Sequence, residues 1–189
     1  VIVQLPLPGQ INAQSVLNAI PPEKDLDVLG ERALGAFYAG RGKVLPPAVA
    51  AIEEVLKKFP LELSQSAVAV VGPGRLVGKP AVVWLLRKAK EVLVFYRGSD
   101  AALLKNADLV ILGAGVPGLI NAGMLKDGAL VLDFGYGKNA EGKISGDLDV
   151  LSLTAHPPAL VSVSYTPTPG GTGPILVAKI LENFYKLNT

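Results

Sequence analysis

The 189-residue sequence predicts an α/β fold in which helices cover both faces of a parallel sheet. Short runs rich in Val, Ile and Leu alternate with longer stretches of helical pattern. Most of these runs are too apolar to have a solvated face, which is typical of strands buried in a parallel sheet. Pro or Gly stands at most junctions, and half of the residues are hydrophobic, so the chain can bury a full core.

Apolar runs and helical patterns place the elements along the chain. The predicted strands are residues 1–5, 67–71, 91–96, 109–112, 130–134 and 160–163. The predicted helices are residues 12–19, 47–58, 79–88, 101–106 and 173–187. The last five strands suffice for a sheet of their own, so we predict two domains. Residues 1–62 form an incomplete first domain that the helix in 173–189 completes, and residues 63–172 form the second.

Composition excludes several classes of protein. The chain has no Cys and one His, so disulfides and the common zinc sites cannot form, and we expect no metal and assign His156 no chemistry. A net charge of +2 leaves no excess of basic residues to neutralise a phosphate backbone, so we expect no nucleic-acid partner. No apolar run reaches the roughly 18 residues of a membrane span, and no signal peptide opens the chain, so we expect a cytoplasmic protein. Because Val1 leads directly into an apolar run, we expect the chain to begin inside a larger protein.

A glycine-rich turn joins the strand 67–71 to the next helix in the phrase AVAVVGPGRLVGKPAVVWLL. Glycines let a backbone turn tightly and approach a pyrophosphate, and the amides at the start of the helix favour an anion. The G-x-G-x-x-x-G spacing is one residue longer than the usual fingerprint, and a plain tight connection is the alternative. We predict a Rossmann-type dinucleotide site at Gly72, Pro73, Gly74, Arg75, Leu76, Val77 and Gly78.

The end of the next strand indicates which dinucleotide binds. An NAD enzyme would place an acidic residue there for the ribose 2′-hydroxyl, whereas this chain has Arg97 and Ser99. A guanidinium suits a 2′-phosphate, so we predict NADP as the cofactor. The alternatives are that Arg97 is a solvated surface residue and that the nearby Asp100 opposes a phosphate.

Two more glycine-containing loops follow strands that should end at the same edge of the sheet. Ligands of open α/β sheets bind beyond the carboxyl ends of the strands. We therefore predict cofactor contacts at these loops, with ordinary turns as the alternative. The predicted residues are Gly113, Ala114, Gly115, Asp133, Gly135 and Tyr136.

Seven ordered phrases resemble the signatures of the bifunctional methylenetetrahydrofolate dehydrogenase/cyclohydrolases, and together they cover essentially the whole chain. The phrases are VQLPLPG (3–9), PPEKDLD (21–27), VVGPGRLVGKP (70–80), NADLVILGAGVPG (106–118), GALVLDFGYG (128–137), GKISGDLD (142–149) and TPTPGGTGP (166–174).

The resemblance implies two α/β domains, a Rossmann domain that binds NADP and a smaller substrate domain that is incomplete here, with folate in a cleft between them. By this resemblance Gln4 and Asp27 are the catalytic polar residues on the substrate side. Pro169, Gly170 and Gly171 line the folate side of the cleft. Tetrahydrofolates as substrates and a homodimer are also implied, as is a last helix that returns to the first domain.

The implied chemistry is hydride transfer from 5,10-methylenetetrahydrofolate to NADP, followed by hydrolysis of the methenyl product to 10-formyltetrahydrofolate. The family's catalytic lysine lies in a Y-x-x-x-K phrase, which this chain lacks, so we expect it upstream. The chain also departs from the family at Val28, where a glycine is usual, and at Pro73 and Gly74, where arginine and serine are usual. Leu45-Pro46-Pro47 replaces C-T-P, and Leu176 replaces a threonine.

Two other interpretations stay open from the sequence. An NADP-dependent dehydrogenase of the shikimate dehydrogenase or glutamyl-transfer-RNA reductase type shares the two-domain plan. A catalytically silent remnant that binds a nucleotide or a partner would also keep the glycine-rich turn. A substrate-competition assay with folate would distinguish the folate enzyme from the first alternative. A Y-x-x-x-K phrase upstream of Val1 would support the enzyme, and its absence would support the remnant.

Overall fold

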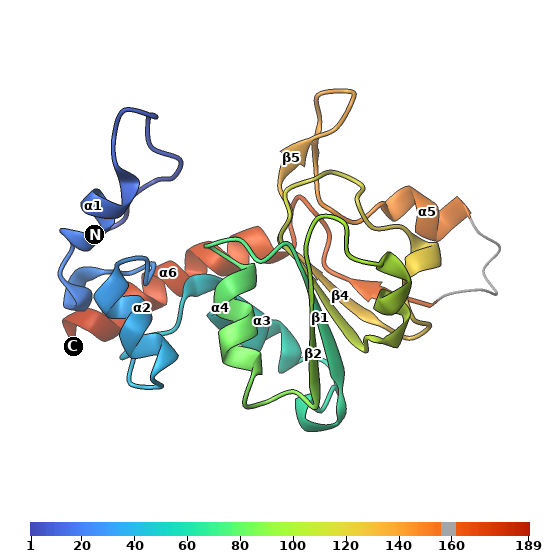
Figure 1. The fold of residues 1–189 in the computed structure, drawn as a ribbon, viewed down its shortest axis with the longest axis horizontal. Coiled ribbons are helices and arrows are strands. Elements are labelled where there is room, and N and C mark those ends of the chain that lie inside the picture. Colours follow the sequence, from blue (N-terminus) through green and yellow to red (C-terminus); the bar gives the residue numbers. More distant parts are fainter. Residues whose placement is uncertain (156–161) are drawn as a thin grey trace.

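A five-stranded parallel sheet organises the larger part of the chain (Figure 1). The computed structural model describes residues 1–155 and 162–189. In spatial order the strands are β2 (Glu91–Phe95), β1 (Ala67–Val71), β3 (Leu109–Leu112), β4 (Leu130–Asp133) and β7 (Ser164–Tyr165). Because β2 lies on one side of β1 and β3 and β4 on the other, the connection after β1 and the connection after β3 run in opposite directions along the sheet. This switch point is where open α/β sheets bind ligands, and the predicted α/β class is confirmed.

Alternate residues of the strands face two different layers of helix. Val68 and Val70 of β1 pack toward α3 (Pro47–Leu56) and α4 (Gly78–Leu85), and Ile175 of α6 (Thr172–Asn188) joins them. Ala69 and Val71 face the other layer. That layer consists of the 3-10 helices η3 (Ala101–Asn106) and η4 (Ala122–Met124) and of α5 (Val150–Ala155). Burial on both faces explains why these strands are apolar throughout.

The first 62 residues contain short helices and no strand. They form α1 (Ala13–Asn18), the 3-10 helix η1 (Pro22–Lys24), α2 (Glu31–Tyr38) and α3, and the 3-10 helix η2 (Leu63–Gln65) follows. Helix α6 runs from the sheet to the end of the molecule where both termini lie (Figure 1). There the Asn183 amide donates hydrogen bonds to the carbonyls of Leu26 and Leu45, so the C-terminal helix α6 packs against the first 62 residues.

Two strand predictions need correction. Residues 1–5 form no strand, because a strand needs a neighbour for its backbone groups and none lies beside this segment in the described part of the chain. For residues 160–163, Leu160 and Val161 lie outside the described residues, as does His156, and the strand observed there is Ser164–Tyr165. The structure also adds helix α2 and a hairpin of β5 (Gly137–Lys138) and β6 (Ile144–Ser145).

Val28 occupies an unusual backbone conformation. Its φ is +56°, in the left-handed region that a β-branched residue rarely adopts. The side chain is 3% exposed and packs with Ala33, Phe37, Val44 and Val49. This is the position where the resembling family usually has glycine, and a positive φ is the physical reason for that preference.

Candidate functional site

The turn after β1 contains two glycines that the fold requires, Gly72 and Gly78, and one that it does not, Gly74. A Cβ built on Gly78 would collide with the Gly72 carbonyl oxygen. Gly72 has a φ of +78°, and a Cβ built on it would lie 2.6 Å from the Cα of Ala114. Around Gly74 the nearest atom to such a Cβ is the Gly113 carbonyl oxygen, 3.9 Å away. Packing therefore explains Gly72, whereas the absence of a side chain at Gly74 leaves the surface in front of the turn open.

Free backbone donors line this open surface. The amides of Arg75, Leu76, Val77 and Gly78 donate no hydrogen bond within the described part of the chain. Helix α4 starts at Gly78 and has no side-chain cap. Free amides at the positive end of a helix macrodipole bind anions, phosphate groups above all.

Unpaired cations surround the same surface. Arg75 and Lys79 are exposed and form no ion pair within residues 1–155 and 162–189. Both line a hollow of about 410 Å³, to which Glu31 and Tyr38 of α2 also contribute. The charge and the free amides fit the diphosphate of a dinucleotide.

The end of β2 holds the residues predicted to select NADP. Arg97 is exposed and has no ion pair or hydrogen bond in the described residues. The Ser99 hydroxyl accepts a hydrogen bond of 2.9 Å from the Tyr96 amide, which leaves its proton free to donate. Asp100 accepts the Ala102 amide and caps η3, so this carboxylate has a structural role beside Arg97.

The loop after β3 differs, because its amides are already bound. The amides of Ala114, Gly115 and Val116 donate to the carboxylate of Asp147 over 2.6, 3.1 and 2.7 Å. Asp147 is 1% exposed, and burial raises the pKa of its carboxyl although the three amides act to lower it. Sequence reasoning missed this residue. Its only signal was the GKISGDLD phrase, which gave no role to any member.

Asp133, predicted to contact the cofactor, ends β4 with its carboxylate fully engaged. Its oxygens accept the amides of Gly135, Asp147 and Leu148 over 2.7, 3.2 and 3.0 Å. Burial is the largest influence on this carboxyl and raises its pKa. The side chain therefore organises the loop, whereas Tyr136 of the same loop is 69% exposed.

The phrase that contains Pro169, Gly170 and Gly171 is anchored to the end of β4. The Asp133 amide donates to the Thr166 hydroxyl, and the Thr172 hydroxyl donates to the Asp133 carbonyl, each over 2.8 Å. A Cβ on Gly171 would collide with the Pro167 carbonyl oxygen. These contacts place the predicted folate-side residues at the carboxyl edge of the sheet.

Gln4 and Asp27 lie in the first region, and no hydrogen bond of the described residues links them to the sheet edge. The Gln4 amide donates only to the carbonyl of Leu5, over 3.2 Å. Asp27 is half-buried without a hydrogen bond in the described chain, and burial followed by the neighbouring Asp25 raises the pKa of its carboxyl.

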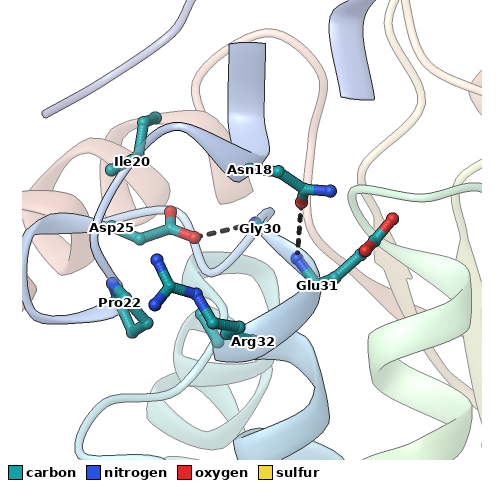
Figure 2. A pocket seen from close by; sticks show the side chains of 8 residues that line it. Asn18, Ile20, Pro22, Asp25, Gly30, Glu31 and Arg32 are labelled. Carbon is teal, nitrogen blue, oxygen red and sulfur yellow. Dashed lines mark hydrogen bonds between the residues drawn. The ribbon is translucent and has the colours of Figure 1, made fainter. Parts of the chain in front are cut away.

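Asp25, the competitor of Asp27 in the sequence, has a structural role. Its carboxylate accepts the amides of Leu29 and Gly30 over 3.0 and 2.8 Å. Figure 2 shows the Asp25 carboxylate bound to the amide of Gly30 and, on the other side of the hollow, the Asn18 oxygen bound to the amide of Glu31 at the start of α2. The Asp25 carboxylate is thus bound within the chain. Of the two aspartates, only Asp27 has a carboxylate without a hydrogen bond in the residues that the structure describes.

Two classes of feature are absent from the residues that the structure describes. No group of three or more His, Cys, Asp or Glu side chains is arranged to hold a metal ion. No described helix has the length and apolar character needed to cross a membrane.

Comparison with known proteins identifies the family. Residues 46–189 match the family model of the tetrahydrofolate dehydrogenase/cyclohydrolase NAD(P)-binding domain. The bifunctional protein FolD of Agathobacter rectalis is 36% identical over 188 residues, which cover 97% of this chain and 64% of that protein. This chain therefore spans less than two thirds of the length of that relative.

Solved structures agree with the family model. The Trypanosoma brucei N5,N10-methylenetetrahydrofolate dehydrogenase-cyclohydrolase, complexed with NADP cofactor and inhibitor, has a TM-score of 0.86 and 30% identity, over 98% of this chain and 65% of that one. The Campylobacter jejuni FolD enzyme has a TM-score of 0.86 and 32% identity, over 98% and 64%. None of these proteins supports a shikimate-dehydrogenase-like enzyme or a silent remnant. The chain belongs to the tetrahydrofolate dehydrogenase/cyclohydrolase family, and its sheet and glycine-rich turn lie in the part that matches the NAD(P)-binding domain.

Proposed function

We propose that this protein oxidises 5,10-methylenetetrahydrofolate to 5,10-methenyltetrahydrofolate with NADP and takes part in hydrolysis of the product to 10-formyltetrahydrofolate. The observation that carries the proposal is a set of amides at residues 75–78 that have no acceptor within residues 1–155 and 162–189, beside the exposed Arg75 and Lys79. The chain that contains them matches an NAD(P)-binding domain. A relative of 30% identity is described in complex with NADP.

Strand order indicates how the cofactor would lie. The diphosphate would bind the turn of Gly72 to Gly78, and the adenosine half would extend over β2. There the Arg97 guanidinium and the free Ser99 proton would bind the 2′-phosphate. Since β3 and β4 lie on the opposite side of β1, the nicotinamide half would lie against the loops that contain Gly113 to Gly115, and Gly135 and Tyr136.

The residues of the chain would mainly position the two reacting rings. Bound NADP supplies the acceptor for a hydride from the folate methylene carbon, which leaves a methenyl cation and NADPH. Pro169, Gly170 and Gly171 would form the surface that holds the folate against the nicotinamide, since hydride transfer depends on proximity and orientation. Gln4 and Asp27 would bind the polar groups of the folate. The half-buried Asp27 carboxylate, which has no hydrogen bond to any described residue, suits this role.

Hydrolysis adds water to the methenyl carbon and releases a proton, so it needs a group that moves protons. A lysine in a Y-x-x-x-K phrase has that role by resemblance, and the 189 residues contain no such phrase. The proposal for the hydrolytic step therefore depends on a lysine outside these residues.

Two further parts of the proposal concern organisation. We propose a first domain in residues 1–62, completed by α6, and a cofactor domain in residues 63–172. The ion pair of Lys179 of α6 with Glu54 of α3 supports that completion. We also propose a homodimer, which sedimentation of the purified chain would test.

NADP binding to the 189-residue chain tests the proposal first. Calorimetry should give micromolar or tighter affinity for NADP and weaker affinity for NAD. Formation of NADPH that depends on 5,10-methylenetetrahydrofolate tests the oxidation. Failure to bind either dinucleotide would overturn the proposed function.

A further inference from the structure

Asp147 holds the loop after β3 through three consecutive backbone amides. One carboxylate oxygen accepts Ala114 and Gly115, and the other accepts Val116. Successive amides that converge on an anion form the same concavity that loops use to bind phosphate. Here the anion belongs to the chain itself, so this concavity is filled by Asp147.

Neighbouring groups hold Asp147 in place. Its own amide and that of Leu148 donate to the Asp133 carboxylate. The Ile120 amide donates to the Asp147 carbonyl over 2.9 Å, which ties the far end of the loop to the same segment. A Cβ on Gly135 would collide with the Asp147 carboxyl carbon, so the side chain has little freedom to move.

The loop that Asp147 holds touches the glycine-rich turn. A Cβ on Gly72 would lie 2.6 Å from the Cα of Ala114, and one on Gly113 would lie 3.1 Å from the Cβ of Val77. A shift of residues 113–116 would therefore alter the site on the side of β3, away from the residues that end β2.

We infer that Asp147 is a positioning residue for the nicotinamide half of the cofactor site. The inference rests on the proposed NADP function. The carboxylate fixes the shape of loop 113–118, and because it takes all three amides, the loop meets the cofactor through its surface shape and not as a second phosphate site.

The test compares Asp147→Asn with Asp108→Asn. Asp108 also binds a backbone amide, that of Ala67 over 2.9 Å, but at the opposite end of the sheet, and it pairs with Lys126. Each variant is titrated with NADP and with adenosine 2′,5′-bisphosphate, which lacks the nicotinamide half.

Asp147→Asn should bind NADP about tenfold more weakly, because an amide group cannot accept from all three donors. Its affinity for adenosine 2′,5′-bisphosphate should fall by much less, and Asp108→Asn should leave both affinities unchanged. Unaltered NADP affinity in Asp147→Asn would overturn the inference, as would an equal loss for both ligands. A native chain that binds neither ligand would instead count against the proposed function.

Hydrogen exchange of the native chain covers the case in which Asp147→Asn does not fold. The amides of Ala114, Gly115 and Val116 should exchange much more slowly than those of Arg75 and Leu76, which have no acceptor in the described chain. Equally fast exchange in both loops would show that Asp147 does not hold the loop and would overturn the inference.

Discussion

Two glycine-rich loops meet at the carboxyl edge of the sheet, and they differ in whether their backbone amides are hydrogen-bonded. After β1, the amides of residues 75–78 have no acceptor within the described chain. After β3, the amides of residues 114–116 all donate to Asp147. The first loop is thus prepared for an external anion, and the second is shaped by an internal one. Glycine content alone does not distinguish them, whereas the hydrogen bonds of the amides do.

The largest expected effect tests the contact between the loops. Gly72→Ala places a Cβ against the backbone of Ala114 at a positive φ, so it should destabilise the protein by about 3 kcal/mol or more. Gly74→Ala, with open space around it, should change the free energy of unfolding by less than about 1 kcal/mol. Urea denaturation measures both. Equal losses of unfolding free energy in the two variants would show that close packing does not distinguish Gly72 from Gly74.

Blocking the first loop should strongly weaken cofactor binding without unfolding the chain. Gly74→Leu puts a bulky side chain in front of the free amides and should weaken NADP about hundredfold in calorimetry, equivalent to about 2.7 kcal/mol. Gly9→Leu is the matched control, because a Cβ built on Gly9 also has open space around it, with no atom within 4 Å, and Gly9 lies outside the site. NADP affinity that survives in Gly74→Leu would remove the turn as the phosphate site.

The end of β2 should contribute a smaller, selective effect. Arg97→Ala removes one charge-assisted contact and should weaken NADP about tenfold while NAD changes less than about twofold. Arg87→Ala, an exposed arginine beyond the far end of α4, should change neither affinity. Equal losses for the two dinucleotides would show that Arg97 does not read the 2′-phosphate.

Val28 has the positive φ that favours glycine but carries a side chain, so it offers a further test of where the fold requires glycine. Val28→Gly relieves about 1–2 kcal/mol of backbone strain but loses a buried side chain that contributes about 1.5–3 kcal/mol. The net loss should therefore stay below about 2 kcal/mol. Val28→Ala loses most of the packing and keeps the positive φ, so it should be the less stable variant in urea denaturation. Val28→Gly as the less stable variant would contradict the strain at this position.

The smallest expected effect is on stability alone, at Glu182 of α6, far from both loops. Hydrogen bonds from Lys179 and Lys186 lower the pKa of Glu182 from 4.5 to about 2. A lowered folded pKa gives stability that is present above pH 4.5 and is lost as pH falls toward 2. Because the group is 40% exposed, Glu182→Gln should cost only about 0.5 kcal/mol at neutral pH, and less at pH near 2.

Thermal unfolding of Glu182→Gln across this pH range should show that convergence with the native chain, with NADP affinity unchanged at neutral pH. A cost that grows as the solution becomes more acidic would contradict the assignment of the lowered pKa.

The sheet was predictable because its strands are buried on both faces. β1 and β3 appear in the sequence as uninterrupted apolar runs, and their bounds are those predicted. Residues 1–5 have a similar composition, but whether such a run pairs depends on a neighbour that composition does not reveal. Helix α2 escaped prediction because Gly35 interrupts a short pattern, and its stability comes from packing of Ala33 and Phe37.

The site was predictable only where its residues are close in sequence. The turn at 72–78 combines strand, glycines and helix in one phrase, so its position followed from local pattern. Asp147 acts on amides 31 to 33 residues earlier, and no local pattern marks such a distant carboxylate. The sequence likewise could not choose between Asp25 and Asp27 as the site residue. The structure shows that Asp25 accepts the amides of Leu29 and Gly30 in the turn before α2.

Amide chemical shifts of the isotopically labelled chain during titration with NADP test the central claim most directly. The amides of Arg75, Leu76, Val77 and Gly78 should show the largest shifts as they acquire an acceptor. Those of Ala114, Gly115 and Val116 should shift less and keep the slow exchange of amides already bound to a carboxylate. NADP binding that leaves the first group unperturbed, or that displaces the second from Asp147, would contradict the account.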